Sequence, residues 1–180
     1  MVPARVRSVP RLFPCERVSL DIFDDAPFRS RNSVDLPITA QQLWEVLTDV
    51  EAMPQWHRLI TKAKWTSPAP HRVGSMRDIE VLGMAATEEV IVWNPYHHLA
   101  FRIAESCRQN TGASAEEFRI ETTENGCRLT WSTGRRPRKP PSWLMRTYAR
   151  PAINRATRRQ MSRLRKYTNQ RFGPAITYSG

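Results

Sequence analysis

The feature that most constrains the fold is a change in the period of the apolar residues near residue 58. From there to residue 133, apolar and polar residues alternate through six successive stretches, as in strands with one buried face. Turn-forming residues separate the stretches, and Asn125-Gly126 is the strongest hairpin signal among them. The predicted strands are residues 59–66, 74–82, 87–93, 98–105, 115–123 and 127–133. An antiparallel sheet of this kind needs an element that covers its apolar face.

One further strand and two short helices are predicted before this sheet. Val34 and Leu36 alternate with polar residues, and the proline that follows ends the strand. Thr39 and Gln42 have the spacing of a capping box, and the helix that they begin, "AQQLWEVLTDV", has one apolar face. A proline at position 54 suits the start of a second short helix, which carries Trp56.

The two ends of the chain have different patterns. Residues 1–27 contain four prolines and no sustained periodicity, which predicts a loosely ordered arm with a short strand at residues 17–23. From residue 142 a broken apolar stripe predicts a long helix with a kink or break at Pro151, followed by a tail at 172–180. The expected fold is therefore α+β, with a seven-stranded curved antiparallel sheet wrapped around the long C-terminal helix.

Charge is distributed very unevenly along the 180 residues, whose net charge is +11. Residues 1–134 contain 15 Lys and Arg and all 17 acidic residues, whereas residues 135–180 contain 13 Lys and Arg and no acid. The C-terminal quarter is therefore strongly cationic. Such a segment suits an anionic membrane surface or nucleic acid, and a solvated helix face is the simpler alternative.

Three stretches carry a resemblance to a known family. They are "VDLPITAQQLWEVLTDVEAMPQWHRLI" (34–60), "VGSMRDIEV" (73–81) and "EEVIVWNPYHHLAFRI" (88–103). In this order they resemble the SRPBCC superfamily, the helix-grip fold of START-like lipid-binding domains, plant pollen-allergen-like proteins and bacterial polyketide cyclase/dehydrase-like proteins. The resemblance implies a helix-grip domain over residues 28–171, with an apolar pocket between the sheet and the long helix. It does not imply one reaction, because fold does not fix function.

If the long helix packs directly on the sheet, the apolar residues on the inward strand faces form the hydrophobic core. If the helix stands off the sheet, the same residues line the pocket. Trp56 either closes one end of that pocket or packs the two short helices together. The candidate ligand-binding residues are Leu47, Trp56, Arg77, Ile79, Val81, Val90, Val92, Phe101, Ile103, Phe118, Ile120, Leu129, Trp131, Tyr148 and Ile153.

Two of the inward positions are charged, which raises the question of catalysis. Arg77 and Glu88 could pair with each other, or Arg77 could meet a ligand carboxylate. A buried Glu88 would have a raised pKa and could act as an acid or base. The alternatives are an Arg77 that reaches solvent, and a Glu88 that either lies at the surface or is only a structural partner of the arginine. These two residues are the catalytic candidates of a cyclase/dehydratase-like enzyme.

The candidate membrane or polyanion surface is the outer side of the long helix. Its residues are Arg146, Arg150, Arg155, Arg158, Arg159, Arg163, Arg165 and Lys166. Three functions remain open: binding or carrying a hydrophobic small molecule with docking to anionic membrane, a cyclase/dehydratase-like enzyme, and nucleic-acid association, which is the least favoured. The partners expected are accordingly a hydrophobic small molecule and an anionic membrane surface.

Other classes of site find little support in the sequence. Four histidines have no metal-binding spacing, and Cys15, Cys107 and Cys127 predict free thiols. We therefore expect no metal and no cofactor.

No apolar run approaches the ~20 residues of a membrane span, and the N-terminus does not have the pattern of a signal peptide. The expectation is a cytoplasmic protein, peripheral at the inner face of the membrane if the basic helix docks there.

Overall fold

The computed structural model describes residues 10–139 and 143–173, with side chains from Pro151 onward in the last helix. In order, the elements are β1 (Phe13–Pro14), α1 (Ile22–Asp25), β2 (Phe28–Leu36), α2 (Ala40–Thr48), α3 (Met53–Trp56), β3 (Ile60–Trp65), β4 (Met76–Val81), β5 (Met84–Asn94), β6 (His98–Ser106), β7 (Ala113–Thr123), β8 (Gly126–Arg136) and α4 (Trp143–Phe172).

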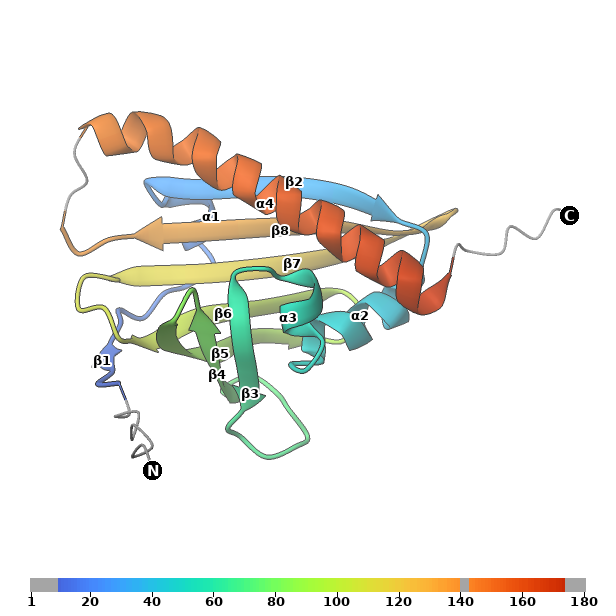
Figure 1. Cartoon of the computed structure of the whole chain (residues 1–180), viewed down its shortest axis with the longest axis horizontal. Helices are drawn as coiled ribbons and strands as arrows, with labels where there is room; N and C mark the ends of the chain where they lie inside the picture. Colours follow the sequence, from blue (N-terminus) through green and yellow to red (C-terminus); the bar gives the residue numbers. More distant parts are fainter. Residues whose placement is uncertain (1–9, 140–142, 174–180) are drawn as a thin grey trace, which may run out of the picture.

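The strands form one antiparallel sheet in the order β2-β8-β7-β6-β5-β4-β3. The long helix α4 crosses one face of this sheet over β2 and β8, and α2 and α3 lie beside its C-terminal half (Figure 1). The predicted α+β helix-grip fold is confirmed. In the part of the chain that is described, an eighth strand is added by the two residues of β1, which pair with β6.

The N-terminal segment differs from the prediction. A short strand was expected at residues 17–23, but this stretch leads into α1, which packs on the sheet face opposite α4 through Ile22 and Phe23. Gly134 of β8 makes this approach possible, because a Cβ there would lie 2.4 Å from the Ile22 carbonyl oxygen. The nearby prolines predicted an irregular segment, but they could not predict the packing of α1 on the sheet.

Strand β2 begins earlier than its apolar residues indicated. It starts at Phe28 rather than near Val34, and its inward side chains include Ser30 and Asn32. Ser30 Oγ lies 2.9 Å from Thr133 Oγ1, and the Asn32 amide oxygen accepts a hydrogen bond of 3.1 Å from Arg158 Nε of α4. Polar side chains can occupy the inner face because they find hydrogen-bond partners there.

The N-terminal cap of α2 is present as predicted. The Thr39 hydroxyl accepts from the Gln42 backbone N–H at 3.1 Å, and the Gln42 side chain accepts from the Thr39 backbone N–H at 2.9 Å. Leu43, Trp44, Val46 and Leu47 of this helix are buried. Together with α3 and the C-terminal half of α4, α2 fills one end of the space between helix and sheet.

Helix α4 continues through Pro151, so no break occurs there. Proline removes one helical hydrogen bond, but packing against the sheet can offset that loss. Met161 and Leu164 of α4 supply such packing, because both are buried in the main core.

A register shift in β5 changes which side chains face the core. Val90 pairs with Phe101 and Val92 with Ala100, so one extra residue lies between them. An extra residue reverses the alternation of faces beyond it. As a result Trp93, rather than Val92, contacts the aromatic rings of Trp44 and Trp65 in the core.

Candidate functional site

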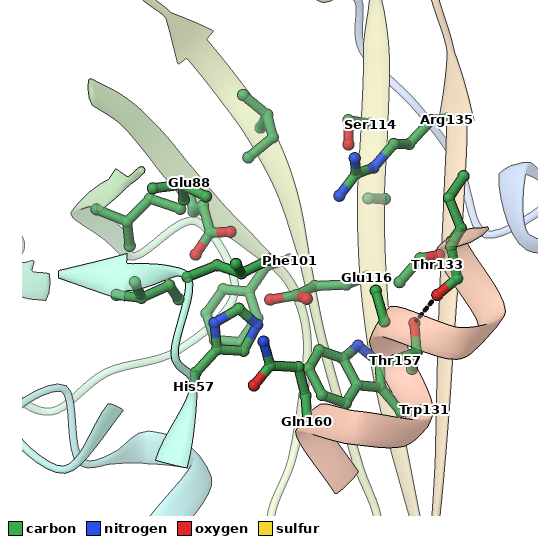
Figure 2. A pocket seen from close by; sticks show the side chains of 18 residues that line it. His57, Glu88, Phe101, Ser114, Glu116, Trp131, Thr133, Arg135, Thr157 and Gln160 are labelled. Atoms are coloured by element: carbon green, nitrogen blue, oxygen red, sulfur yellow. Dashed lines mark hydrogen bonds between the residues drawn. The ribbon is translucent and has the colours of Figure 1, made fainter. Parts of the chain in front are cut away.

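A cavity of about 210 Å³ lies between the sheet and α4. Seven of the predicted inward residues lie in its wall: Ile79, Val81, Glu88, Phe101, Ile103, Trp131 and Ile153. The sequence did not single out the other eleven: His57, Leu59, Ile60, Ser114, Ala115, Glu116, Thr133, Arg135, Ala156, Thr157 and Gln160. The wall thus combines an apolar majority with several polar side chains that point into the same space (Figure 2).

The remaining candidates lie elsewhere. The buried ones belong to the main core, where α2, α3 and α4 close over the sheet: Leu47, Trp56, Val90, Phe118, Ile120 and Leu129. Val92 is half-buried beyond the register shift, and the side chain of Tyr148 lies outside the described residues. The cavity under α4 is therefore shorter than one lined by all of the predicted inward residues. The residues that lie outside its wall remain predicted ligand contacts only.

Trp56 lies one layer behind the cavity wall. Its side chain is almost wholly buried, and its ring meets the ring of Trp131 edge-to-face, with centroids 6.1 Å apart. His57, the next residue, reaches the wall itself. The short helix α3 thus holds Trp131 from behind and presents His57 to the cavity.

Arg77 and Glu88 form a buried ion pair. Arg77 Nε lies 2.6 Å from Glu88 Oε2, and the side chains are 1% and 5% exposed. The guanidinium carbon lies 3.5 Å from the centroid of the Phe101 ring, a cation–π contact. Glu88 lines the cavity, whereas Arg77 lies outside its wall, behind Phe101. Of the alternatives left open by the sequence, a solvent-exposed Arg77 is excluded.

Glu116 of β7 is a second carboxyl in the wall, and it was not among the residues predicted from the sequence. It pairs with Phe101 across the strands, and Oε1 lies 3.6 Å from Arg77 Nη2. Burial raises the pKa of Glu116 to about 7, and the negative charge of Glu88 adds to the increase. The signal was available, because Glu116 is two residues before Phe118 on the same strand face.

His57, which follows α3, and Gln160 of α4 both line the cavity (Figure 2). Burial lowers the pKa of His57 to about 4, so its imidazole is neutral at neutral pH. The Gln160 side-chain oxygen accepts a hydrogen bond of 3.2 Å from the Arg58 backbone N–H. This bond ties α4 to the loop after α3, and both residues supply polar edges to a largely apolar space.

The outer side of α4 is cationic. In the part of the helix whose side chains are described, six of the predicted basic residues are exposed: Arg155, Arg158, Arg159, Arg163, Arg165 and Lys166. Arg146 and Arg150 lie outside the described side chains. No helix within the described ranges is long and apolar enough to cross a membrane.

Metal-binding clusters are absent from the described residues. No group of three or more His, Cys, Asp or Glu side chains is placed to hold an ion there. Cys15, Cys107 and Cys127 are free thiols, as the sequence predicted.

Comparison with known proteins gives a consistent picture. The family described as "Polyketide cyclase / dehydrase and lipid transport" matches residues 27–168. Uncharacterized protein Rv2574 of Mycobacterium tuberculosis is 42% identical over 168 residues, which cover 91% of this chain and 98% of that protein.

Solved structures share the fold at low sequence identity. A START superfamily protein from Mycobacterium smegmatis has a TM-score of 0.61 at 14% identity, over 79% of this chain and 97% of that one. DynU16, from the dynemicin biosynthetic locus, has a TM-score of 0.58 at 19% identity, over 82% of this chain and 49% of that one. These similarities confirm the predicted resemblance to the SRPBCC superfamily.

Proposed function

Because the chain belongs to the polyketide cyclase / dehydrase and lipid transport family, we propose that its internal cavity binds a small hydrophobic molecule. The observation that carries the proposal is the cavity under α4, with Phe101, Ile103 and Ile153 among its apolar walls. Its volume of about 210 Å³ is below the ~300–1,000 Å³ typical of pockets for drug-sized ligands. The ligand is accordingly compact, or only part of a longer ligand lies inside.

Native mass spectrometry beside a denatured sample tests this proposal. A bound ligand appears as a mass excess that disappears on denaturation, and its mass indicates its chemical class. The variant Ile103→Trp, which fills the cavity from its wall, should lose the excess. Val73→Trp is the matched control, because Val73 is exposed and does not line the cavity. Absence of both a mass excess and any uptake of an added apolar fluorophore would contradict the proposal.

A second candidate is an enzyme of the cyclase/dehydratase kind. The observation that favours it is the placing of two carboxyls, Glu88 and Glu116, in one apolar cavity beside Arg77. In such a reaction a carboxylate removes a proton from the carbon next to a ketone, and a carboxylic acid returns a proton to the leaving hydroxyl as water departs. Turnover of a poly-β-ketone that is lost in both Glu88→Gln and Glu116→Gln would support the enzyme. Turnover that persists in both variants would exclude a catalytic role for these two carboxyls.

The basic side of α4 suggests where the binding protein works. We propose that the basic side of α4 docks on an anionic membrane, because its six basic residues with described side chains are exposed. Sedimentation with anionic and neutral vesicles tests the docking. Binding to duplex DNA without binding to anionic vesicles would instead favour nucleic acid as the partner.

A further inference from the structure

Strand β2 lies at one edge of the sheet, so only one of its two sides is paired (Figure 1). It spans nine residues, Phe28–Leu36, and it pairs with β8 without any register shift. Within the described residues, no hydrogen bond outside this ladder uses its backbone N–H or C=O groups. An edge strand that is long, regular and free of internal proline is a template for a further strand.

The opposite edge of the sheet is less suited to pairing. Strand β3 spans only six residues, and its register with β4 shifts between Ile60 and Lys62. It also carries two exposed lysines, Lys62 and Lys64. Short length, irregular register and lysine side chains all protect an edge from further pairing. Among the two edges, β2 is therefore the one that is open to a partner.

A groove follows the free edge of β2. Two open hollows, of about 320 and 470 Å³, share Arg31 in their walls, and together they are lined by β2 from Arg29 to Val34. The other lining residues come from α1 and α4: Phe23, Asp24, Asn154, Arg158, Met161 and Ser162. Because an extended chain rises ~3.3 Å per residue, a segment of about six residues matches the length of this groove.

The groove is cationic. Arg29 and Arg31 are exposed on the outer face of β2, and Arg158 of α4 reaches the inner side, where its Nε donates to the Asn32 amide oxygen. Among the described residues, neither Arg29 nor Arg158 has an acidic partner. Arg31 lies 3.1 Å from Asp24, but the two side chains are 55% and 75% exposed, so solvent weakens this pair. The edge therefore favours acidic side chains over basic ones.

We propose that the free edge of β2 binds an extended segment of a partner protein in which acidic and apolar side chains alternate. Backbone hydrogen bonds to β2 supply affinity, and carboxylates opposite Arg29 and Arg31 supply selectivity, because side chains directly opposite on one sheet face lie close together. The apolar side chains of the segment lie on the other face, beside Val34 and Met161 in the groove wall.

A second copy of this chain is a poorer occupant than an acidic partner. Each copy has a net charge of +11, and the one acid within β2, Asp35, is already bonded to Arg128 through both carboxylate oxygens. The ends of the chain are no better, because neither residues 1–9 nor residues 174–180 contain an acid. The inference is independent of the cavity and of the three arginines on α4 at positions 155, 159 and 163.

Three labelled peptides test the proposal on the full chain by fluorescence polarisation. They consist of four Glu-Val repeats, four Lys-Val repeats or four Glu-Pro repeats. The Glu-Pro peptide keeps the carboxylates, but proline removes alternate N–H groups and favours a helix with three residues per turn, which does not keep the Glu side chains on one face. The Glu-Val peptide should bind at least about tenfold more tightly than either of the others.

Two double variants locate the binding. Arg29→Glu/Arg31→Glu should weaken binding of the Glu-Val peptide by roughly tenfold, because two attractive cross-strand pairs become repulsive. Arg17→Glu/Arg108→Glu is the matched control, since it makes the same change of charge at exposed residues outside the groove, and it should bind as wild type.

Four outcomes would overturn the proposal. Equal binding of the Glu-Val and Glu-Pro peptides would show attraction by charge without an added strand. Equal losses in the two double variants would place the peptide elsewhere. Absence of Glu-Val binding, with anionic vesicle binding lost only in the Arg29→Glu/Arg31→Glu variant, would assign these arginines to lipid. A dimer in sedimentation that the same variant abolishes would assign the edge to a second copy of the chain.

Discussion

At the scale of single residues, the buried pair Arg77–Glu88 stabilises the fold only while both partners are present. Removing one partner leaves an uncompensated charge inside the protein, which typically costs about 3–5 kcal/mol. We expect Arg77→Met to lower the free energy of unfolding by about this amount in urea denaturation. The double variant Arg77→Met/Glu88→Leu should recover most of the loss, because neither charge of the pair is then left buried without its partner.

An exposed pair provides the control for this prediction. Arg128 and Asp35 form two hydrogen bonds, of 2.7 and 3.1 Å, but their side chains are 50% and 64% exposed. Arg128→Met should leave the free energy of unfolding nearly unchanged, because solvent screens such pairs. A double variant at Arg77 and Glu88 that is less stable than either single variant would contradict the argument.

Glu116 and His57 give opposite contributions to the pH dependence of stability. The pKa of Glu116 rises from 4.5 to about 7 on folding, so the folded state binds its proton more tightly and stability falls as pH rises through this window. The pKa of His57 falls from 6.5 to about 4, so its contribution increases as pH rises through that window. In the wild-type protein the two slopes partly cancel between about pH 4.5 and 6.5.

The variant Glu116→Gln should separate these contributions. It keeps the His57 slope and loses the fall due to Glu116, so its stability relative to wild type should increase from pH 4 to pH 8. With ~1.4 kcal/mol per pKa unit, the increase is on the order of 3 kcal/mol for the shift to about 7. Urea denaturation of the ligand-free protein at several pH values measures it. Equal pH profiles for the two proteins would show that Glu116 ionises normally.

At the scale of elements, the sequence predicted the order of strands and helices well and their exact faces less well. Periodicity and turn residues located the strands from residue 59 onward, and the capping box located α2. The early start of β2 was missed because Ser30 and Asn32 are polar, and their partners come from β8 and α4. The register shift in β5 was missed because a bulge depends on pairing with β6, which single-strand periodicity does not report.

Helix α4 borders the cavity on one side. Ala156 lines the cavity yet is exposed, so a large side chain at this position should occupy the entrance. We expect Ala156→Phe to weaken binding of an added apolar fluorophore by roughly tenfold or more while changing the free energy of unfolding by less than about 0.5 kcal/mol. Ala152→Phe is the matched control, because Ala152 is exposed on the same helix but does not line the cavity. Equal losses in both variants would contradict this route of access.

At the scale of the whole molecule, the existence of a cavity could not be deduced from the chain. The same inward residues make a filled core or a pocket, depending on how far α4 stands off the sheet. In this structure both outcomes occur along one helix. Near Met161 and Leu164 the space is filled by α2 and α3, whereas beside Ile153 and Gln160 it is open. Whether the space under α4 is filled or open depends on how α2 and α3 pack against it. The periodicity of the strands does not predict that packing.

The charge asymmetry gives a prediction that concerns the molecule as a whole. Arg155, Arg159 and Arg163 are spaced four residues apart, so they lie along one side of α4, and all three are exposed. Near an anionic membrane each basic residue contributes ~1 kcal/mol, an attraction that salt screens. The protein should therefore bind vesicles rich in anionic lipid at low salt and dissociate from them at high salt. The variant in which these three residues are changed to Glu should not bind the vesicles.

A second triple variant distinguishes a docking surface from a general effect of net charge. Arg17, Lys64 and Arg108 are exposed and lie outside α4, and changing them to Glu alters the net charge by the same amount. If α4 is the surface that meets the membrane, this control should bind vesicles much more tightly than the α4 variant. If the two variants bind equally weakly, the attraction depends on overall charge, and the proposal that the basic side of α4 is the docking surface is wrong.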